Sequence, residues 1–197
     1  MNSKADIIKK DLKTVLDKNR YEHTLGVVKS AIHLAKKYGE DVYKAEIASL
    51  LHDYAKQFDE DTKKKLKKKY NIKFDKVEKE SQQLQHAIFS EVIAKHKYDI
   101  KDDDVLNAIR YHTTGREDMS KLEMIVCLAD YIEEGRDFSG VDEIRRLSEI
   151  SLEDALYFAT NNTICHLCQK NVLVHNYTLK ARNYFLEKTK VFVKNDK

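Results

Sequence analysis

The sequence predicts an all-α fold made of one helical domain. Its 197 residues contain no proline and only five glycines, whereas β-sandwiches and β-barrels need many tight turns built from these two residue types. Apolar residues make up 42% of the chain, which is enough for a core, and they recur at helical spacing almost from end to end. Since the length leaves little room for a second domain, we expect residues 1–197 to form a single domain.

The first part of the chain carries three apolar stripes with the period of a helix. They cover residues 3–17, 21–38 and 42–56, and the third is more apolar than the other two. Gly39 follows the second stripe and is typical of the position just after a helix. We therefore expect three helices before residue 57.

The lysine-rich segment at residues 60–70 has two interpretations. Its basic run, KKKLKKKY (63–70), could bind nucleic acid. It could also be the solvated face of a helix that Leu66 and Tyr70, four residues apart, anchor to the protein. We favour the anchored helix, because the acidic residues 59–61 precede it and suit the positive end of the helix dipole.

Similar stripes predict six further helices. They cover residues 84–97, 103–113, 121–134, 141–149, 152–173 and 175–190. Asp102 and Ser120 stand just before the second and third of these, and both residue types cap helix N-termini. No internal repeat or long loop separates the helices, which favours one helical bundle.

The charge balance and the cysteine count exclude several classes of protein. The 36 basic and 33 acidic residues give a net charge of +3, which is too balanced to predict a nucleic-acid partner. No run approaches the roughly eighteen apolar residues of a membrane span, and the first residues lack the apolar region of a signal peptide. Three cysteines do not make a disulfide framework, so we expect a reduced, cytoplasmic protein.

The placement of histidine and aspartate carries the chemical signal. His52 and Asp53 are adjacent in an apolar stretch, and burying both is costly unless they are paired or bind a metal. Taken alone, the pair could be a structural hydrogen bond. Four more such residues lie in, or at the end of, other apolar stretches: His23, His86, His112 and Asp130. Because facing helices of a bundle build metal sites, we expect all six side chains to converge in the core.

The same residues carry a resemblance to a known family. Their order, H…HD…H…H…D, is that of the HD superfamily of metal-dependent phosphohydrolases. Four segments extend the match: RYEHTLGV (20–27), LLHDYAK (50–56), YHTTG (111–115) and ADYIEEGRDF (129–138). They resemble the bacterial HD-domain symmetrical bis(5′-nucleosyl)-tetraphosphatases over about residues 15–185. The resemblance implies a helical bundle of the HD-domain type.

The chain departs from the family pattern at three positions. Ala87 follows His86 where the family often has glycine, and Glu134 and Asn176 stand where it often has proline. Since none of the three is a metal ligand, these departures bear on loop geometry and not on the ligand set.

The resemblance implies two bound metal ions, with Asp53 bridging them. One ion would be held by His23, His52, Asp53 and Asp130, and the other by Asp53, His86 and His112. The resemblance favours iron. Imidazole-rich ligation with two carboxylates also suits manganese, cobalt, nickel or zinc better than magnesium or calcium.

The implied reaction is the symmetrical hydrolysis of diadenosine tetraphosphate, or a related dinucleoside tetraphosphate, to two ADP by a metal-activated water. Asp53 and Lys56 are the expected catalytic residues. Lys56 lies three residues after Asp53 and would project from the metal face if that helix persisted. The expected substrate-binding residues are Arg20, Lys56, Thr113, Thr114, Gly115 and Arg136. Arg116 and Arg182 are better explained as surface salt bridges.

Other functions stay open at this point. The chain could be another HD phosphohydrolase, acting on a mononucleotide or a cyclic dinucleotide. It could instead be a non-catalytic, metal-containing module that binds nucleotides or RNA. The long C-terminal helices could also form a homodimer.

Three further positions have two interpretations each. His175 could cap the last helix or line the site, and we favour the cap. Phe138 could stack on a nucleobase or belong to the core or a lid. Cys165 and Cys168 have the spacing of a metal-binding pair, but no second pair is present to complete a site, so we expect both thiols to pack.

Overall fold

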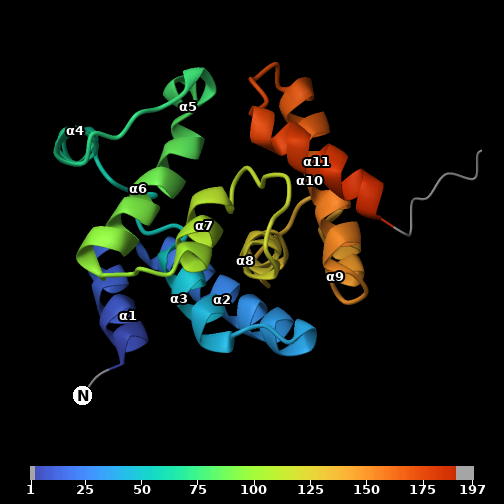
Figure 1. Cartoon of the computed structure of the whole chain (residues 1–197), viewed down its shortest axis with the longest axis horizontal. Helices are drawn as coiled ribbons and strands as arrows, with labels where there is room; N and C mark the ends of the chain where they lie inside the picture. The colour runs from blue at the N-terminus through green and yellow to red at the C-terminus, as the bar shows by residue number, and fades with distance from the viewer. Residues whose placement is uncertain (1–2, 190–197) are drawn as a thin grey trace, which may run out of the picture.

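The computed structural model describes residues 3–189, which contain eleven helices and no strand. In chain order the helices are α1 (Lys4–Val15), α2 (Lys18–Tyr38), α3 (Val42–Leu51), α4 (Glu60–Lys69), α5 (Lys76–Glu80), α6 (Gln82–Lys97), α7 (Asp103–Tyr111), α8 (Lys121–Ile132), α9 (Val141–Ser148), α10 (Leu152–Gln169) and α11 (Asn176–Lys188) (Figure 1). The predicted all-α class is confirmed.

The predicted capping residues begin and end the helices as expected. Asp102 accepts hydrogen bonds from two backbone N–H groups in the first turn of α7, and Ser120 accepts one in α8. Gly39 ends α2 in the left-handed region, at a φ of 66°. These local signals are strong because each one satisfies backbone groups that a helix end leaves without partners.

Some helix boundaries differ from the predictions. α3 ends at Leu51, earlier than predicted, because the chain continues there in tight turns. α10 also ends early, at Gln169, and Asn171 then turns the backbone to a φ of 54°. No apolar stripe predicted α5, since five residues are too few to carry a helical period. The last predicted helical position, residue 190, lies outside the described residues.

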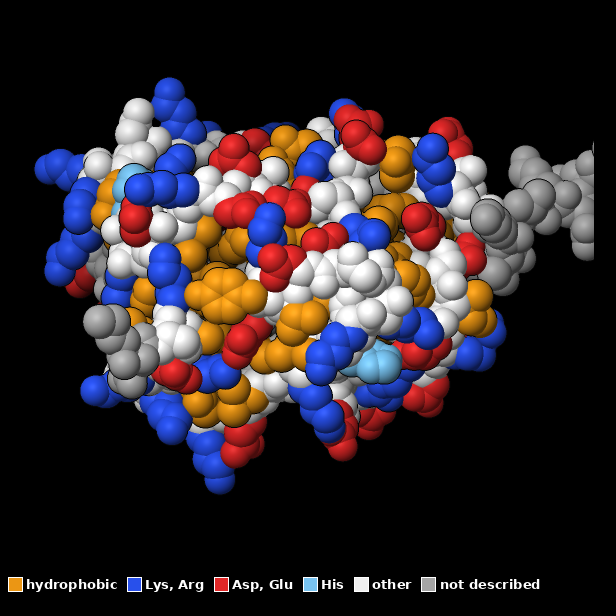
Figure 2. All heavy atoms as spheres, turned by 60° about the horizontal axis from the view of Figure 1, so that its bottom comes forward, with side chains coloured by type: hydrophobic (Ala, Val, Ile, Leu, Met, Phe, Trp, Pro, Cys, Tyr) orange, Lys and Arg blue, Asp and Glu red, His pale blue; other side chains and the backbone are white. Residues whose placement is uncertain are grey.

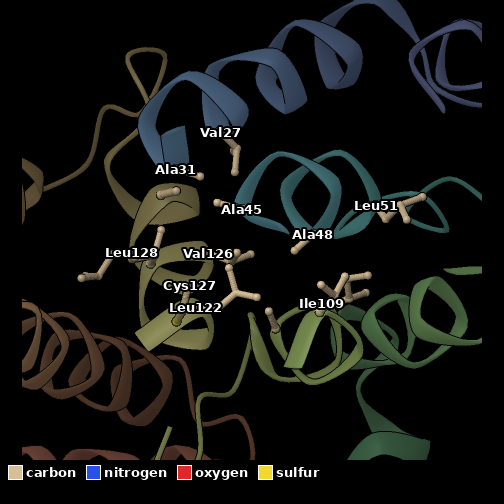
Figure 3. Close-up of a cluster of buried hydrophobic side chains, with 14 of the residues drawn as sticks. Val27, Ala31, Ala45, Ala48, Leu51, Ile109, Leu122, Val126, Cys127 and Leu128 are labelled. Carbon is tan, nitrogen blue, oxygen red and sulfur yellow. The ribbon is translucent and has the colours of Figure 1, made fainter. Parts of the chain in front are cut away.

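α2, α3, α7 and α8 form the central part of the main apolar core (Figure 3). Small side chains let α2 and α3 approach each other closely, since Ala31, Ala45 and Ala48 are fully buried. Larger side chains of α3, α7 and α8 fill the remaining space: Leu51, Ile109, Leu122, Val126 and Leu128. This packing fixes the C-terminal ends of α3 and α7.

Five of the other helices flank this core on two sides. α4 and α5 lie on one side, whereas α9, α10 and α11 lie on the other (Figure 1). α10 packs against α8, α9 and α11. The molecule therefore has a central group of helices between two outer groups.

The lysine-rich helix α4 lies on the surface and buries none of its residues. Leu66 and Tyr70 pack against a small apolar cluster that includes Ile72, Ile88 and Phe89. This arrangement agrees with the favoured interpretation of an anchored, solvated helix. Figure 2 shows acidic and basic side chains interleaved over one face of the molecule. Within residues 3–189, no helix is both long enough and apolar enough to span a bilayer.

The cysteines divide between the core and the surface. Cys127 is buried in the core, as expected. Cys165 and Cys168 are exposed, so the prediction that they pack is wrong. The reason is that the buried residues of α10 end at Thr160, and the last two turns of the helix extend beyond the core.

His175 joins two distant parts of the chain. Its Nδ1 accepts a hydrogen bond from the backbone N–H of Tyr177 at 3.1 Å and so caps α11. Its Nε2 lies 2.8 Å from Oδ2 of Asp75, the residue that caps α5. Of the two interpretations of His175, the structure supports the cap.

We predict that His175→Ala lowers the thermal unfolding midpoint. Replacing an N-cap by alanine costs about 0.5–2 kcal/mol, which corresponds to roughly 1–8 °C in a protein of this size. His175→Asn keeps a capping side chain and should lose less. Calorimetry that finds the same midpoint for His175→Ala and the wild type would contradict this role.

Candidate metal centre

Six polar side chains meet at the centre of the fold from five helices or helix ends. They are His23 on α2, His52 and Asp53 directly after α3, His86 on α6, His112 directly after α7, and Asp130 on α8. Four of them, His52, Asp53, His86 and His112, are at most 3% exposed. The structure thus brings together all six residues that the sequence suggested as ligands.

Asp53 lies between two pairs of imidazole rings. Its Oδ1 is 2.8 Å from Nε2 of His86 and 3.8 Å from Nε2 of His112. Its Oδ2 is 3.7 Å from Nε2 of His52 and 3.8 Å from Nε2 of His23. One carboxylate oxygen therefore faces each histidine pair, and this division matches the two ligand sets that the resemblance implied.

Asp130 closes one side of this arrangement. Its Oδ1 lies 3.1 Å from Nε2 of His23 and 3.9 Å from Nε2 of His52. Ligand atoms of His23, His52 and Asp130 lie within 4.8 Å of one another, and so do those of His52, Asp53 and His112. Such spacing suits the edges of a coordination sphere with metal–ligand bonds of about 2.0–2.2 Å.

Backbone carbonyl groups set the orientation of two of the rings. Nδ1 of His52 lies 2.6 Å from the carbonyl oxygen of Ser49, and Nδ1 of His112 lies 2.8 Å from that of Ile109. Since a carbonyl oxygen only accepts, each Nδ1 carries the proton and donates it there. The neutral rings therefore turn the lone pairs of Nε2 into the cluster, as metal-binding histidines do.

Several buried atoms of the cluster have no hydrogen-bond partner within residues 3–189. They are Nε2 of His23, Nε2 of His52 and Oδ1 of Asp53. The Nε2 atoms of His86 and His112 lie only 3.1 Å apart. Buried polar atoms without partners are costly, and two ring nitrogens this close repel unless one of them carries a proton. Divalent cations on the two sides of Asp53 would satisfy these atoms, so the residues fit bound metals.

The protonation states also suit a metal. Burial lowers the pKa of His52, and burial lowers that of His112 to about 3. Burial alone would raise the pKa of Asp53, but its contacts with the rings of His52 and His86, including a hydrogen bond from His86, and the charge of Lys56 hold that pKa well below its usual value. At neutral pH the two histidines are neutral and the aspartate is ionised, which is the state in which each residue binds a metal.

Three basic side chains border the cluster. Arg20 donates from Nη1 to Oδ2 of Asp53 at 2.9 Å, and Arg136 donates to the carboxylate of Asp130 and, at 2.7 Å, to its carbonyl oxygen. Nζ of Lys56 lies 3.6 Å from Oδ1 of Asp53. These cations balance the two buried carboxylates, and each remains partly exposed toward solvent.

Lys56 reaches the cluster by a different route from the one predicted. The helix does not persist, because α3 ends at Leu51. Instead, the backbone N–H of Lys56 donates to the carbonyl of Asp53 at 2.9 Å in a tight turn. The turn leaves Nζ 3.4 Å from both ring nitrogens of His86.

In the segment after α7, Thr113 contacts the cluster, whereas Thr114 and Gly115 hydrogen-bond to backbone carbonyl groups. Oγ1 of Thr113 lies 3.0 Å from Nε2 of His112. The hydroxyl of Thr114 donates to the carbonyl of Gly115, and the N–H of Gly115 donates to the carbonyl of Tyr111 at 2.8 Å. Of the three residues of this segment that were predicted to bind substrate, only Thr113 lies at the cluster.

The two later arginines have partners away from the cluster. Arg116 forms a bidentate pair with the buried carboxylate of Glu123, at 2.7 and 2.5 Å. Nε of Arg182 lies 3.3 Å from Oδ1 of Asn161. Arg116 forms the kind of ion pair that the sequence favoured, whereas Arg182 donates to asparagine side chains instead.

Glu133 is a site residue that the sequence analysis did not identify. Its Oε1 lies 3.1 Å from Nδ1 of His23, and its Oε2 accepts from the N–H of Gly135 at 2.7 Å. A Cβ at Gly26 would lie 2.6 Å from Oε2 of Glu133, so a glycine there makes room for this carboxylate. The position of Glu133, three residues after Asp130, was the available signal.

A cavity of about 530 Å³ opens beside the cluster. His112, Thr113, Asp130 and Arg136 are among the residues that line it. A small molecule in this cavity would therefore reach two of the six cluster residues and one of the bordering cations. Its volume is in the range of small-molecule sites in proteins.

Known proteins share this fold and sequence. The model of the HD domain family matches residues 20–135. A Halalkalibacterium halodurans protein named symmetrical bis(5′-nucleosyl)-tetraphosphatase is 42% identical over 183 residues, which cover 89% of this chain and 93% of that protein. A Bacillus subtilis protein of the same name is 38% identical over 175 residues, with coverages of 89% and 94%.

A solved structure agrees with these similarities. It is a Clostridium acetobutylicum protein described as a predicted HD superfamily hydrolase involved in NAD metabolism. It superposes with a TM-score of 0.89 at 40% identity, covering 96% of this chain and 100% of that one. Because the family match spans more than half of the chain and the relatives match almost end to end, the chain belongs to the HD domain family, in the group that contains the symmetrical bis(5′-nucleosyl)-tetraphosphatases.

Proposed function

We propose that this protein hydrolyses diadenosine tetraphosphate and related dinucleoside tetraphosphates symmetrically, giving two ADP from diadenosine tetraphosphate. The observation that carries the proposal is the position of Asp53 between two histidine pairs, beside a cavity of about 530 Å³. The names of the relatives support the same substrate.

The ligand assignment follows the two sides of Asp53. His23, His52 and Asp130 would hold one metal with Oδ2 of Asp53, and His86 and His112 the other with Oδ1. Two cations bound here would lower the pKa of a water and neutralise phosphoryl oxygens. We favour iron, and manganese, cobalt, nickel and zinc also suit the donor set.

The chain's own cations would bind the tetraphosphate. Arg20, Lys56 and Arg136 border the cluster and remain partly exposed, so their charge is available to a polyanion. Thr113 could add a hydroxyl group from the cavity wall. The hydroxyl of Thr114 and the N–H of Gly115 would have to leave their present partners to bind a phosphate, and their roles stay predictions.

We also propose that the chain works as one domain in the cytoplasm. The free Cys165 and Cys168 on the surface suit a reducing compartment. A homodimer stays an expectation, which the molar mass in solution tests.

The experiment that tests the proposal is product analysis. The protein would be loaded anaerobically with ferrous iron, given diadenosine tetraphosphate, and its products separated by ion-exchange chromatography. Two ADP as the sole product, lost on chelation, is the expected result. ATP and AMP would contradict the symmetrical cut. Turnover of mononucleotides or cyclic dinucleotides alone would favour another HD phosphohydrolase, and no turnover with any metal would favour a binding module.

We predict that Asp53→Ala removes metal and activity together. Asp53 contacts both histidine pairs, so its loss should empty both metal positions. Metal content by mass spectrometry and turnover on the same sample are the readouts. Asp142→Ala is the control, because its carboxylate is exposed and pairs with Arg145, which is not a cluster residue. Full turnover by metal-depleted Asp53→Ala would refute the mechanism.

We predict that Lys56→Ala lowers kcat/KM for the tetraphosphate by about a hundredfold, as expected when one preorganised donor is removed. Metal content should stay at the wild-type value, since Lys56 is not a ligand. Lys65→Ala, on the exposed face of α4, is the control. A collapse of metal content in Lys56→Ala would instead assign the lysine a structural role.

We predict that Glu133→Gln weakens metal binding by about 10–100-fold, the usual effect of losing a carboxylate behind a metal-binding histidine. The change keeps the shape of the side chain but removes the charge beside Nδ1 of His23. Glu134→Gln is the matched control, because Glu134 is the next residue in the chain and its carboxylate is exposed and pairs with Lys29. Equal metal affinities in the two variants would show that Glu133 does not support His23.

A further inference from the structure

The cavity beside the metal centre has a second wall that the proposed chemistry does not use. α10 contributes Ala159, Asn162, Thr163 and His166, and the loop between α8 and α9 contributes Phe138. All five residues follow residue 135, the end of the family match. The wall is therefore formed by the part of the chain that follows the HD-domain match.

The α10 residues form one stripe along the helix. Their spacing of three, four and seven places puts them on a single face. The stripe begins at Ala159, which is 1% exposed, and ends at the exposed His166. Thr163 ties this face to α8, since its Oγ1 lies 2.8 Å from the hydroxyl of Tyr131. The stripe therefore forms a wall that is closed at one end and open at the other.

The loop that carries Phe138 lies close against this stripe. Gly140 has a φ of 93°, and a Cβ there would lie 2.9 Å from Nδ2 of Asn162. A glycine thus lets the loop approach the asparagine amide. Phe138 itself is 39% exposed, which excludes the interpretation that it belongs to the core.

The two walls of the cavity differ in charge. On the first wall, His112 and Asp130 belong to the metal centre and Arg136 borders it. With metals bound, this wall suits the phosphate groups of a substrate. Phe138 and the α10 stripe carry an aromatic ring, an amide, a hydroxyl and an imidazole, without any lysine or arginine. The second wall therefore suits an uncharged, planar, hydrogen-bonding group.

A nucleobase has this chemistry. Aromatic side chains stack on the faces of bases, which suits Phe138 and the imidazole of His166. An asparagine amide can both donate to N7 and accept from N6 of adenine, and Asn162 lines the cavity. The wall thus offers groups for both the face and the edge of a purine.

We propose that Phe138, Asn162 and His166 form a nucleobase subsite that takes one adenine of the substrate while its phosphates reach the metal centre. The inference rests on the proposed function, because that function supplies a substrate with both parts. Phe138 and His166 contact the faces of the base, and Asn162 reads its edge.

The test compares ligands with and without a base. Calorimetry would measure the binding of ADP and of methylenediphosphonate, a non-hydrolysable diphosphate, to the full-length protein loaded with Mn²⁺. Phe138→Ala and His166→Ala should each weaken ADP binding by about tenfold and leave methylenediphosphonate binding unchanged. Asn162→Asp, which loses the amide donor, should lower the preference for ADP over GDP.

Cys168→Ala is the matched control, because Cys168 is exposed on the same helix, two residues and roughly 200° from His166. If Phe138→Ala and His166→Ala bind ADP as tightly as the wild type, the subsite is overturned. The proposed function still stands in that case, provided that the protein produces two ADP from the tetraphosphate. Base-dependent ADP binding without hydrolysis would support the subsite while the proposed reaction fails. Equal losses for ADP and methylenediphosphonate would also overturn the subsite.

Discussion

The direction of the imidazole rings is the constraint on which the site depends. Protons on the outer nitrogens of His52 and His112 are fixed by backbone carbonyls, so the inner nitrogens present lone pairs to Asp53. Lone pairs and carboxylates that face one another in a buried place repel, and low dielectric strengthens that repulsion. Positive charge must therefore be present. Neighbouring basic side chains supply part of it, and the unpartnered inner atoms indicate that metal ions supply the rest.

The helices serve this requirement through their ends. α3 and α7 each stop directly before a cluster histidine, and the carbonyl that orients the histidine belongs to the last turn of the same helix. The core of small and branched side chains between α2, α3, α7 and α8 fixes those ends. The outer helix α10 adds a wall without lysine, arginine or carboxylate side chains beside them. Charge is thus concentrated at one part of the cavity and absent from another.

Much of this arrangement could be predicted from the sequence, because helices and buried polar residues leave local marks. Apolar stripes and caps such as Asp102 and Ser120 identified the helices, and polar residues inside apolar stretches identified the six cluster residues. The end of α3 could not be predicted, since its apolar pattern continues past Leu51. The contact of Glu133 with His23 and the wall on α10 depend on tertiary packing, and a single sequence carries no signal for such distant contacts.

Anomalous diffraction from crystals of the full-length protein grown with Mn²⁺ would show whether Asp53 bridges two metal ions. Two peaks are expected about 3.5–4 Å apart, one on each side of Asp53. Oδ1 should bind the ion that His86 and His112 hold, and Oδ2 the ion that His23 and His52 hold. A single ion, or two ions that do not share Asp53, would contradict a bridging role for this aspartate.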